Sequence, residues 1–287
     1  DELTAKLKSE LTNWLTYTSG EKDKFFYYDK EIKGLVAAEP QYGSDSFNDH
    51  HFHYGYFIYA AAVLGHYDTD FVSDYGAAVS IIGKDIADEG GDLFPRLRTY
   101  DAYEGHSWAG GIDTFADGNN QESVSEAVNA WFALMEWSKV VKDQNMKSLA
   151  TWLYANESTA ATTYYYANPS NPYPKEYQHT GVSLLWGGKS DWATWFSAKP
   201  EAKHAITMLP LSGGSSYLRT NDAAGTSIAS LDKSLGGQPR GAYQDILLLG
   251  QSLADPKKAQ ANFNDLLPID NSNTISYIYY YLGWADK

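Results

Sequence analysis

The sequence predicts a mainly α-helical protein, organised as one domain whose functional residues lie at helix mouths and in the loops between helices. Along most of the chain, apolar residues recur at the spacing of one helix face, and clusters of glycine and proline separate these segments. The 287 residues can bury a sizeable core, and 43% hydrophobic with 20% charged residues is typical of a globular protein. No repeat of fixed period and no low-complexity linker divides the chain, so we expect a single domain over residues 1–287.

The N-terminal part of the chain predicts three helices and one extended region. Leucine and tryptophan side chains at helical spacing predict a one-sided surface helix over Leu3–Tyr17. Phe25–Pro40 contains short extended pieces around a glycine and leads through a polar loop to the next helix. That helix lies within Asn48–Gly65, where an apolar, alanine-rich run follows the first turns, and another helix covers Asp70–Asp88. A loop follows at Gly90–Asp101.

The remainder of the chain predicts further helices interrupted by short extended pieces. Three glycines disfavour a helix at Tyr103–Ile112, so we expect a loop there. The most regular helix of the sequence covers Glu122–Val141 and another covers Met146–Tyr166. Short strands are expected at Val182–Trp186 and Ile206–Leu211, and a loop over a cleft at SGGSSYL. Proline and glycine then separate three last helices, which we expect at Gly241–Leu253, Pro256–Leu266 and Asn273–Trp284.

Ionisable residues are concentrated at the start of the Asn48–Gly65 helix. Asp49 and three of the chain's seven histidines, His50, His51 and His53, lie close together in sequence. An ionisable group taken out of water must find a partner or shift its pKa, so this concentration indicates a functional site. If the helix already includes Asp49, the four-residue spacing places its side chain on the same face as His53. The alternative is an ordinary helix start, in which the aspartate is an N-cap and the histidines are solvated or buried without a metal.

A second candidate segment is the loop Tyr103–Ile112. It holds Glu104, His106 and Trp108, a mixture of polar and aromatic side chains that is typical of a loop lining a cleft. A surface turn with a buried tryptophan would explain the same residues without any function.

A third candidate is the helix Glu122–Val141. At 100° per residue, Glu122 and Glu126 fall on one face about one turn apart, opposite an apolar stripe. Paired carboxylates could perform acid–base chemistry. The competing interpretation is a solvent-facing helix whose glutamates serve as capping partners near its start.

Composition narrows the class of ligand. Nine Trp, 23 Tyr and 11 Phe make 15% of the chain, and such side chains combine an apolar face with, in Tyr and Trp, a polar group, which suits a carbohydrate. The formal charge of 22 minus 36, or −14, disfavours nucleic acid and anionic membrane surfaces as partners. Cysteine is absent, which excludes disulfides and thiolate chemistry. No apolar run approaches the roughly 20 residues of a membrane span, and the acidic N-terminus is not a signal peptide.

Three blocks of sequence carry a family resemblance: DHHFHYGY at Asp49–Tyr56, YEGHSWA at Tyr103–Ala109 and DGNNQESVSEAVNAW at Asp117–Trp131. They resemble the signature motifs of glycoside hydrolase family 81, which comprises endo-β-1,3-glucanases. The segments YYDKEIKGLV, LWGGKSDWATWF and ITMLPLSGGSSYL also resemble that family in order and approximate spacing. The resemblance therefore covers most of the chain.

The resemblance implies a fold and a mechanism. The fold would be an (α/α)6-type helical barrel with some helices shortened or missing, and the family's N-terminal β-sandwich would be absent. The reaction would be an inverting, endo-acting hydrolysis of β-1,3-glucan, in which Asp49 is the general acid and Glu122 the general base. His53 and Glu126 would support these two groups, and the motif leaves open which glutamate activates the water. Inversion requires the acid and the base to converge on one sugar linkage.

The same resemblance implies the remaining partners. No cofactor and no metal are expected, the polymer would be the only partner, and we expect a secreted monomer. Substrate contacts are assigned to aromatic and polar residues of the three blocks, namely Tyr54, Tyr56, Tyr103, Glu104, His106, Trp108 and Asn120.

Two other functions compete with hydrolysis. A helical glucan-binding module without catalysis would keep the aromatic groove but would not need paired carboxylates. A metal enzyme could use His50, His51 and His53 with either Glu122 or Glu126 as ligands. Adjacent histidines do not easily direct both rings at one ion, and HHFH lacks the H-E-x-x-H spacing of a helical zinc site.

Overall fold

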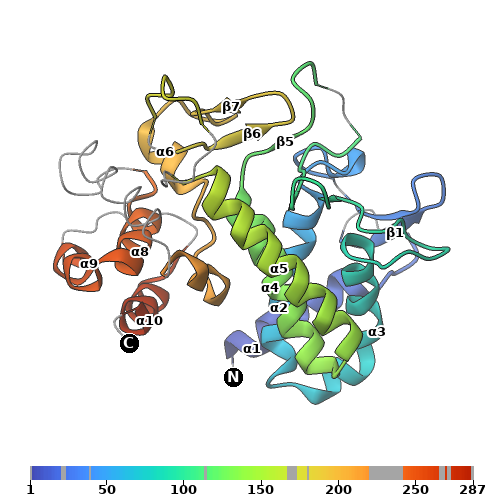
Figure 1. The fold of residues 1–287 in the computed structure, drawn as a ribbon. Helices are drawn as coiled ribbons and strands as arrows, with labels where there is room; N and C mark the ends of the chain where they lie inside the picture. Colours follow the sequence, from blue (N-terminus) through green and yellow to red (C-terminus); the bar gives the residue numbers. More distant parts are fainter. Residues whose placement is uncertain are drawn as a thin grey trace. The chain divides into compact units, whose positions relative to one another are not determined.

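A computed structural model describes the chain at residues 2–20, 24–38, 40–112, 115–166, 173–179, 181–219, 242–264, 269 and 273–285. These residues form mainly α-helices, with short strands in the connecting segments (Figure 1), and the predicted mainly α class is confirmed. They fall into two compact units, unit 1 with Asp1–Asn119 and Asn129–Glu157, and unit 2 with Asn120–Val128 and Ser158–Lys287. That the whole chain is a single domain stays a prediction. Among the described helices, none is long and apolar enough to cross a membrane.

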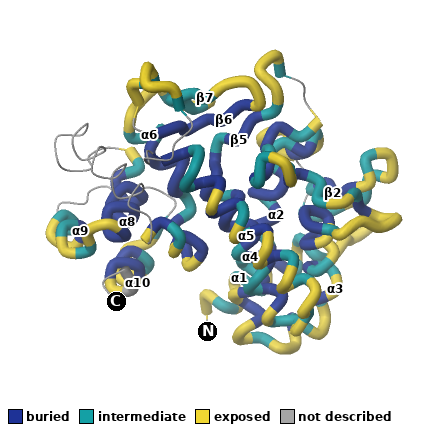
Figure 2. Tube along the Cα trace, in the orientation of Figure 1, coloured by how far each residue is buried: buried dark blue, intermediate teal, exposed yellow. Residues whose placement is uncertain are grey.

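Unit 1 is built on helices α1 (Glu2–Leu15), α2 (His50–Gly65) and α3 (Thr69–Ile86), with parts of α4 (Val124–Val141) and α5 (Gln144–Tyr164). Because α2 is apolar on nearly all sides, most of its length is buried, as Figure 2 shows. Gly55 lets α2 approach α4 closely, since a Cβ there would lie 2.7 Å from the Cα of Ala130. The start of α3 is capped by Asp68, whose carboxylate accepts from the Phe71 N–H.

The short strands of unit 1 form two antiparallel hairpins. Strand β1 (Phe26–Asp29) pairs with β2 (Gly34–Ala37), which confirms the extended pieces expected around Gly34. Strand β3 (Tyr100–Asp101) pairs with β4 (His106–Ser107), and this second hairpin lies within the two segments predicted to be loops. A single-turn 3₁₀ helix, η1 (Ser44–Ser46), precedes α2.

The core of unit 1 is aromatic and aliphatic. Trp131 and Trp137 of α4 are fully buried and pack in one cluster with Ile58 and Leu64 of α2 and Phe71 of α3. Burying one such side chain contributes about 1.5–3 kcal/mol relative to leaving it exposed, so this cluster holds the helices that carry the first candidate site residues.

Unit 2 combines a small sheet with short helices. Strands β5 (Asn120–Gln121), β6 (Leu184–Trp186) and β7 (Ser190–Asp191) form an antiparallel sheet in that order. The helical elements are α6 (Pro200–Ala205), η2 (Gly213–Leu218), α8 (Gln244–Ala254), α9 (Pro256–Phe263) and α10 (Ile275–Ala285). Helix α8 is buried over almost its whole length (Figure 2) and forms the centre of this unit's core.

Three predicted elements differ from the structure. Helix α4 begins at Val124 instead of Glu122, because Asn120 and Gln121 pair with β6. Residues 206–211 form a turn and an irregular segment after α6, not a strand, and SGGSSYL is largely the 3₁₀ helix η2. Two of the C-terminal helices expected from the sequence have end residues outside the described residues, namely Gly241 in one and Asp265 and Leu266 in the other.

Candidate active site

Asp49 stands immediately before α2, at its N-cap position. Its backbone has φ 52° and ψ 23°, the left-handed region, and its carboxylate does not cap the helix. A non-glycine residue in this region costs on the order of 1–3 kcal/mol and persists only where neighbouring contacts hold it. Two such contacts are present: the Asp49 N–H donates to the Ala109 carbonyl at 2.9 Å, and its carbonyl accepts from the His53 N–H at 3.1 Å. An ordinary capping role therefore does not explain the Asp49 carboxylate.

The backbone on both sides of this position is tightly packed against the Tyr103–Ile112 loop. A Cβ on Gly111 would lie 2.2 Å from the Ser46 carbonyl oxygen and 2.7 Å from the Asn48 nitrogen. Glycine is needed there both for the close approach and for its φ of 60°. The Ile112 N–H also donates to the Ser46 carbonyl at 3.0 Å. Backbone contacts therefore hold the loop against the segment that leads into Asp49.

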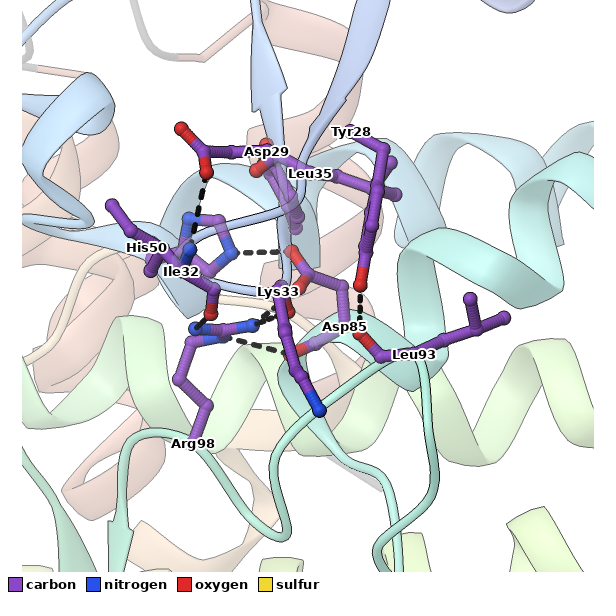
Figure 3. A network of polar contacts seen from close by, with 10 residues as sticks. Tyr28, Asp29, Ile32, Lys33, Leu35, His50, Asp85, Leu93 and Arg98 are labelled. Carbon is purple, nitrogen blue, oxygen red and sulfur yellow. Dashed lines mark hydrogen bonds and ion pairs between the residues drawn. The ribbon is translucent and has the colours of Figure 1, made fainter.

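His50 anchors the first turn of α2 through a buried charged network. Its Nε2–H donates to Asp85 Oδ2 at 2.5 Å, and Arg98 Nη2 contacts the other Asp85 oxygen at 3.1 Å. Figure 3 shows both side chains directed at the Asp85 carboxylate, with Arg98 also donating to the carbonyls of Ile32 and Lys33. Burial lowers the pKa of His50, so the neutral imidazole acts here as a hydrogen-bond donor.

His51 belongs to a different buried network. The Ser107 hydroxyl donates to Glu157 Oε1 at 3.1 Å, so its oxygen accepts from His51 Nε2–H at 2.9 Å. Glu157 also accepts from the Ser107 N–H and from the Trp131 indole N–H. Burial lowers the pKa of His51 to about 3 and raises that of Glu157. This network attaches the hairpin β3–β4 to helices α2, α4 and α5.

The two adjacent histidines therefore serve two separate networks. His53, half-buried, lies with its ring 5.8 Å from that of Tyr42, and burial lowers its pKa. Within the described ranges, no group of three or more His, Asp or Glu side chains is arranged to hold a metal ion. The geometry does not support the metal-enzyme alternative, because His50 and His51 direct their Nε2 atoms at different protein partners.

The Tyr103–Ile112 loop places its candidate residues at different depths. Tyr103 is 93% exposed, whereas His106 is buried with its ring 4.4 Å from that of Trp108. Asp101 organises the loop, because it accepts from the N–H groups of Tyr103 and Glu104 and from the Trp108 indole N–H at 3.2 Å. Burial alone would raise the pKa of Asp101, but these hydrogen bonds outweigh it and the pKa lies below its ordinary value.

The two tyrosines that follow Asp49 differ in exposure. Tyr54 is 1% exposed, donates its hydroxyl to the Leu35 carbonyl at 2.6 Å and packs against His50 and Phe26. This burial corrects the expectation that Tyr54 contacts substrate: its place is in the core of unit 1. Tyr56, by contrast, is exposed.

The remaining candidates belong to unit 2. Asn120 is buried in β5 opposite Trp186, and Glu122 follows that strand before α4 begins. The expectation that Glu122 and Glu126 share one helix face is wrong, because only Glu126 lies in the helix. The structure thus groups Asp49, His53 and the Tyr103–Ile112 loop in one unit and these three residues in the other. That the two groups converge stays a prediction.

Glu122 has the electrostatics of a group that titrates near neutral pH. Burial raises its pKa to about 7, opposed by a 2.8 Å hydrogen bond from the Trp195 N–H to Oε1, while the negative charge of Glu126 raises it further. Such a carboxyl can exchange a proton with water under ordinary conditions. Of the two influences that raise the pKa of Glu122, burial is larger than the charge of Glu126.

The sequence did not indicate Trp195 as a site residue. It is 59% exposed, and its ring lies 5.5 Å from that of Trp186 in an edge-on arrangement. The signal that could have found it is the clustering of tryptophans in LWGGKSDWATWF.

Comparison with known proteins gives consistent matches. The model of the glycosyl hydrolase family 81 C-terminal domain matches residues 1–277. A glucan endo-1,3-beta-D-glucosidase of Acetivibrio thermocellus is 35% identical over all of this chain and 38% of its own length, and one of Thermobifida fusca is 34% identical over 92% of this chain and 35% of its own length. The chain therefore spans less than two fifths of these two relatives.

A solved structure extends the likeness to the fold. The family 81 glycoside hydrolase from Clostridium thermocellum has a TM-score of 0.93 and 35% identity, covering 98% of this chain and 40% of the other. This likeness confirms the predicted (α/α)6-type helical class.

Proposed function

Since the chain belongs to glycoside hydrolase family 81, we propose that it is the helical catalytic part of an inverting, endo-acting β-1,3-glucanase. The observation that carries this proposal is Glu122, a half-buried carboxyl in a family 81 motif whose pKa lies at about 7. A carboxyl with this pKa is suited to proton transfer at neutral pH. The relatives named glucan endo-1,3-beta-D-glucosidases support the substrate, a β-1,3-linked glucan.

Asp49 acts as the general acid in this mechanism. It donates a proton to the glycosidic oxygen as the bond to the anomeric carbon breaks, so the leaving sugar departs as a neutral alcohol. The proposal is supported by the held backbone of Asp49 and by a carboxylate that is not used for helix capping. A fixed backbone keeps the acid at one place relative to the leaving oxygen.

Glu122 acts as the general base. It removes a proton from a water molecule whose oxygen attacks the anomeric carbon from the face opposite the leaving group, which inverts its configuration. Glu126 supports this role through its negative charge, which favours proton uptake by Glu122. His53 supports the general acid, Asp49. It lies one turn into α2, and its N–H donates the first backbone hydrogen bond of that helix to the Asp49 carbonyl.

Substrate contacts come from exposed and half-buried groups. Tyr56 and Tyr103 are exposed, and Glu104 and Trp108 are held by their hydrogen bonds to Asp101. His106 and Asn120 are buried, so we assign them the role of positioning the residues around them instead of contacting the substrate. We also propose action outside the cell, because the substrate is a polymer; a monomeric state stays a prediction.

Two isosteric variants test the mechanism in the full chain. Asp49→Asn and Glu122→Gln should each lower the rate of reducing-end release from a linear β-1,3-glucan by about 10²- to 10⁴-fold. Proton NMR of the first product should show the α-anomer. Glu136→Gln, on the same helix as Glu126, serves as the matched control and should retain the wild-type rate. Near wild-type turnover in either site variant would refute its role, and binding of glucan without hydrolysis would favour the non-catalytic module.

A further inference from the structure

Glu157 is a buried carboxylate of unit 1 that the proposed mechanism does not use. It lies on α5 and is 0% exposed, although a charged side chain is rarely buried completely unless it is paired. Its oxygens accept from neutral donors, namely the Ser107 N–H at 2.9 Å, the Ser107 hydroxyl at 3.1 Å and the Trp131 indole N–H at 3.1 Å. A satisfied network of this kind in the core fixes the groups that take part in it.

Fold stability by itself does not require a carboxylate at this position. Replacing a buried polar group and its partners by apolar groups of the same shape can be nearly neutral for the free energy of unfolding. What Glu157 adds is direction, because its oxygens draw donors from α4 and from the hairpin β3–β4 to one point. The position of that hairpin is therefore the property that depends on Glu157.

The hairpin leads directly to the backbone of the proposed general acid. Ser107 is bonded to Glu157 through both its main chain and its side chain. Two residues later, the Ala109 carbonyl accepts from the Asp49 N–H at 2.9 Å. The residue between them is held as well, because the Trp108 N–H donates to a main-chain carbonyl at 2.8 Å. A displacement of Ser107 is therefore passed on to Asp49.

The same network also reaches Asp49 from the side of helix α2. His51 lies two residues after Asp49, and its Nε2–H donates to the Ser107 hydroxyl oxygen at 2.9 Å. Its ring stacks on that of Trp131, with 5.6 Å between the centroids and 17° between the planes. The loop and the start of α2 are thus joined on both sides of the acid, and Glu157 anchors this junction at Ser107.

Asp49 is a residue for which such an anchor matters. Its left-handed backbone is unfavourable without contacts that hold it. A general acid must also stand within hydrogen-bond reach of the leaving oxygen, and a misplacement of about 1 Å can lower the rate by about 10²-fold. A small shift of the loop would therefore weaken proton donation before it affects the binding of the polymer.

We propose that Glu157 is a positioning residue for the general acid: through Ser107 it holds the Tyr103–Ile112 loop, and the loop holds the backbone of Asp49. Glu157 lies in the core and touches neither the sugar nor the attacking water. This inference rests on the proposed hydrolase function, which it deepens by naming the residue that keeps the acid in place.

The test uses the full chain and two substrates that differ in their need for an acid. Cleavage of β-1,3-glucan requires a proton on the leaving oxygen, whereas a dinitrophenyl glycoside of a β-1,3-linked oligosaccharide releases a stable phenolate without one. Glu157→Gln replaces one acceptor oxygen by an NH₂ group, and Ser107→Ala removes the hydroxyl but keeps the main-chain bond to Glu157. Both variants should lower kcat on glucan by about 10- to 100-fold, leave KM near its wild-type value and hydrolyse the dinitrophenyl substrate at nearly the wild-type rate.

Ser80→Ala is the matched control. It removes a serine hydroxyl of α3 that accepts from the Trp137 indole N–H at 3.0 Å, so it breaks a comparable bond to α4 away from the loop. It should follow wild type on both substrates. Ser107→Ala, as the milder change, decides the result if Glu157→Gln does not fold.

Two outcomes would overturn the positioning role: equal losses on both substrates, which indicate general damage to the fold, and wild-type kcat on glucan in the folded variants. Asp49→Asn is measured in parallel and tests the proposed function separately. It should lose activity on glucan and keep it on the dinitrophenyl substrate, because only the former needs the acid. If Asp49→Asn loses both activities equally, Asp49 is not the acid, and the acid assignment fails together with the role of Glu157.

Discussion

At the scale of single residues, Glu122 differs from a surface carboxylate in its pKa. Its ordinary pKa of 4.5 is raised to about 7, first by burial and then by the charge of Glu126. A helix-surface glutamate would keep its hydration and its ordinary pKa. Burial of Glu122 ahead of α4 is the main cause of this difference, and the hydrogen bond from the Trp195 N–H opposes it.

The first prediction concerns the pH dependence of hydrolysis. A general base acts only when ionised, so kcat/KM of the wild type should fall as the pH drops below about 7. Glu126→Gln removes a negative charge that raises the pKa of Glu122, so its acidic limb should move to lower pH. The measurement is kcat/KM as a function of pH for the wild type and for Glu126→Gln. An unchanged limb, or one displaced upwards, would contradict the assigned coupling.

A second residue-scale prediction concerns Arg98. Arg98→Ala leaves the buried Asp85 carboxylate with His50 alone, and breaking a buried ion pair in this way costs about 3–5 kcal/mol. The free energy of unfolding from urea titration should fall by this amount. Lys8→Ala, which removes a solvent-screened surface ion pair with Asp68, should have a far smaller effect and is the control. A loss of similar size in both variants would show that the Arg98 network does not hold the entrance of α2.

At the scale of elements, the entrance of α2 depends on one backbone contact that two glycines can test. Gly111 and Gly105 lie in the same loop at φ 60° and 77°, but only Gly111 packs on the segment before Asp49. A Cβ on Gly105 would meet nothing within 4 Å. An alanine at either position would have the same conformational cost of a left-handed backbone. Only the alanine at position 111 would also clash with the segment before Asp49.

Gly105→Ala should therefore lower the free energy of unfolding by about 1–2 kcal/mol and leave kcat unchanged. Gly111→Ala should cost about 1–3 kcal/mol more and should lower kcat, because the added methyl displaces the Asp49 segment from the loop. Thermal unfolding and kcat on β-1,3-glucan, measured for both variants, distinguish the two effects. Equal behaviour of the two alanine variants would show that the packing of Gly111 on residue 46 is unimportant for catalysis.

At the scale of the whole molecule, inversion sets a distance between two carboxyl groups. The acid and base of an inverting glycosidase stand roughly 6.5–9.5 Å apart, which leaves room for the attacking water. We predict this separation between Asp49 and Glu122 in a crystal structure of Asp49→Asn with a bound β-1,3-oligosaccharide. A separation near 5 Å would instead indicate a retaining mechanism, and one of tens of ångströms would remove the proposed pair altogether.

The sequence by itself determined the local elements and the family. Helical periodicity located α1 through α5, because side chains that repeat with the period of one helix face depend only on neighbours in the chain. The motif blocks identified the family in the same way, since they are contiguous runs of residues. Both kinds of information are carried over short distances along the chain.

Tertiary structure decided what each polar group does, because its partners are distant in sequence. His50 bonds Asp85, 35 residues away, and Glu122 receives an N–H from Trp195, 73 residues away. No periodicity could distinguish His50 as an anchor in the core from His50 as a metal ligand. Burial and hydrogen bonding are properties of the packed chain, and they fix pKa and chemical role only once distant segments meet.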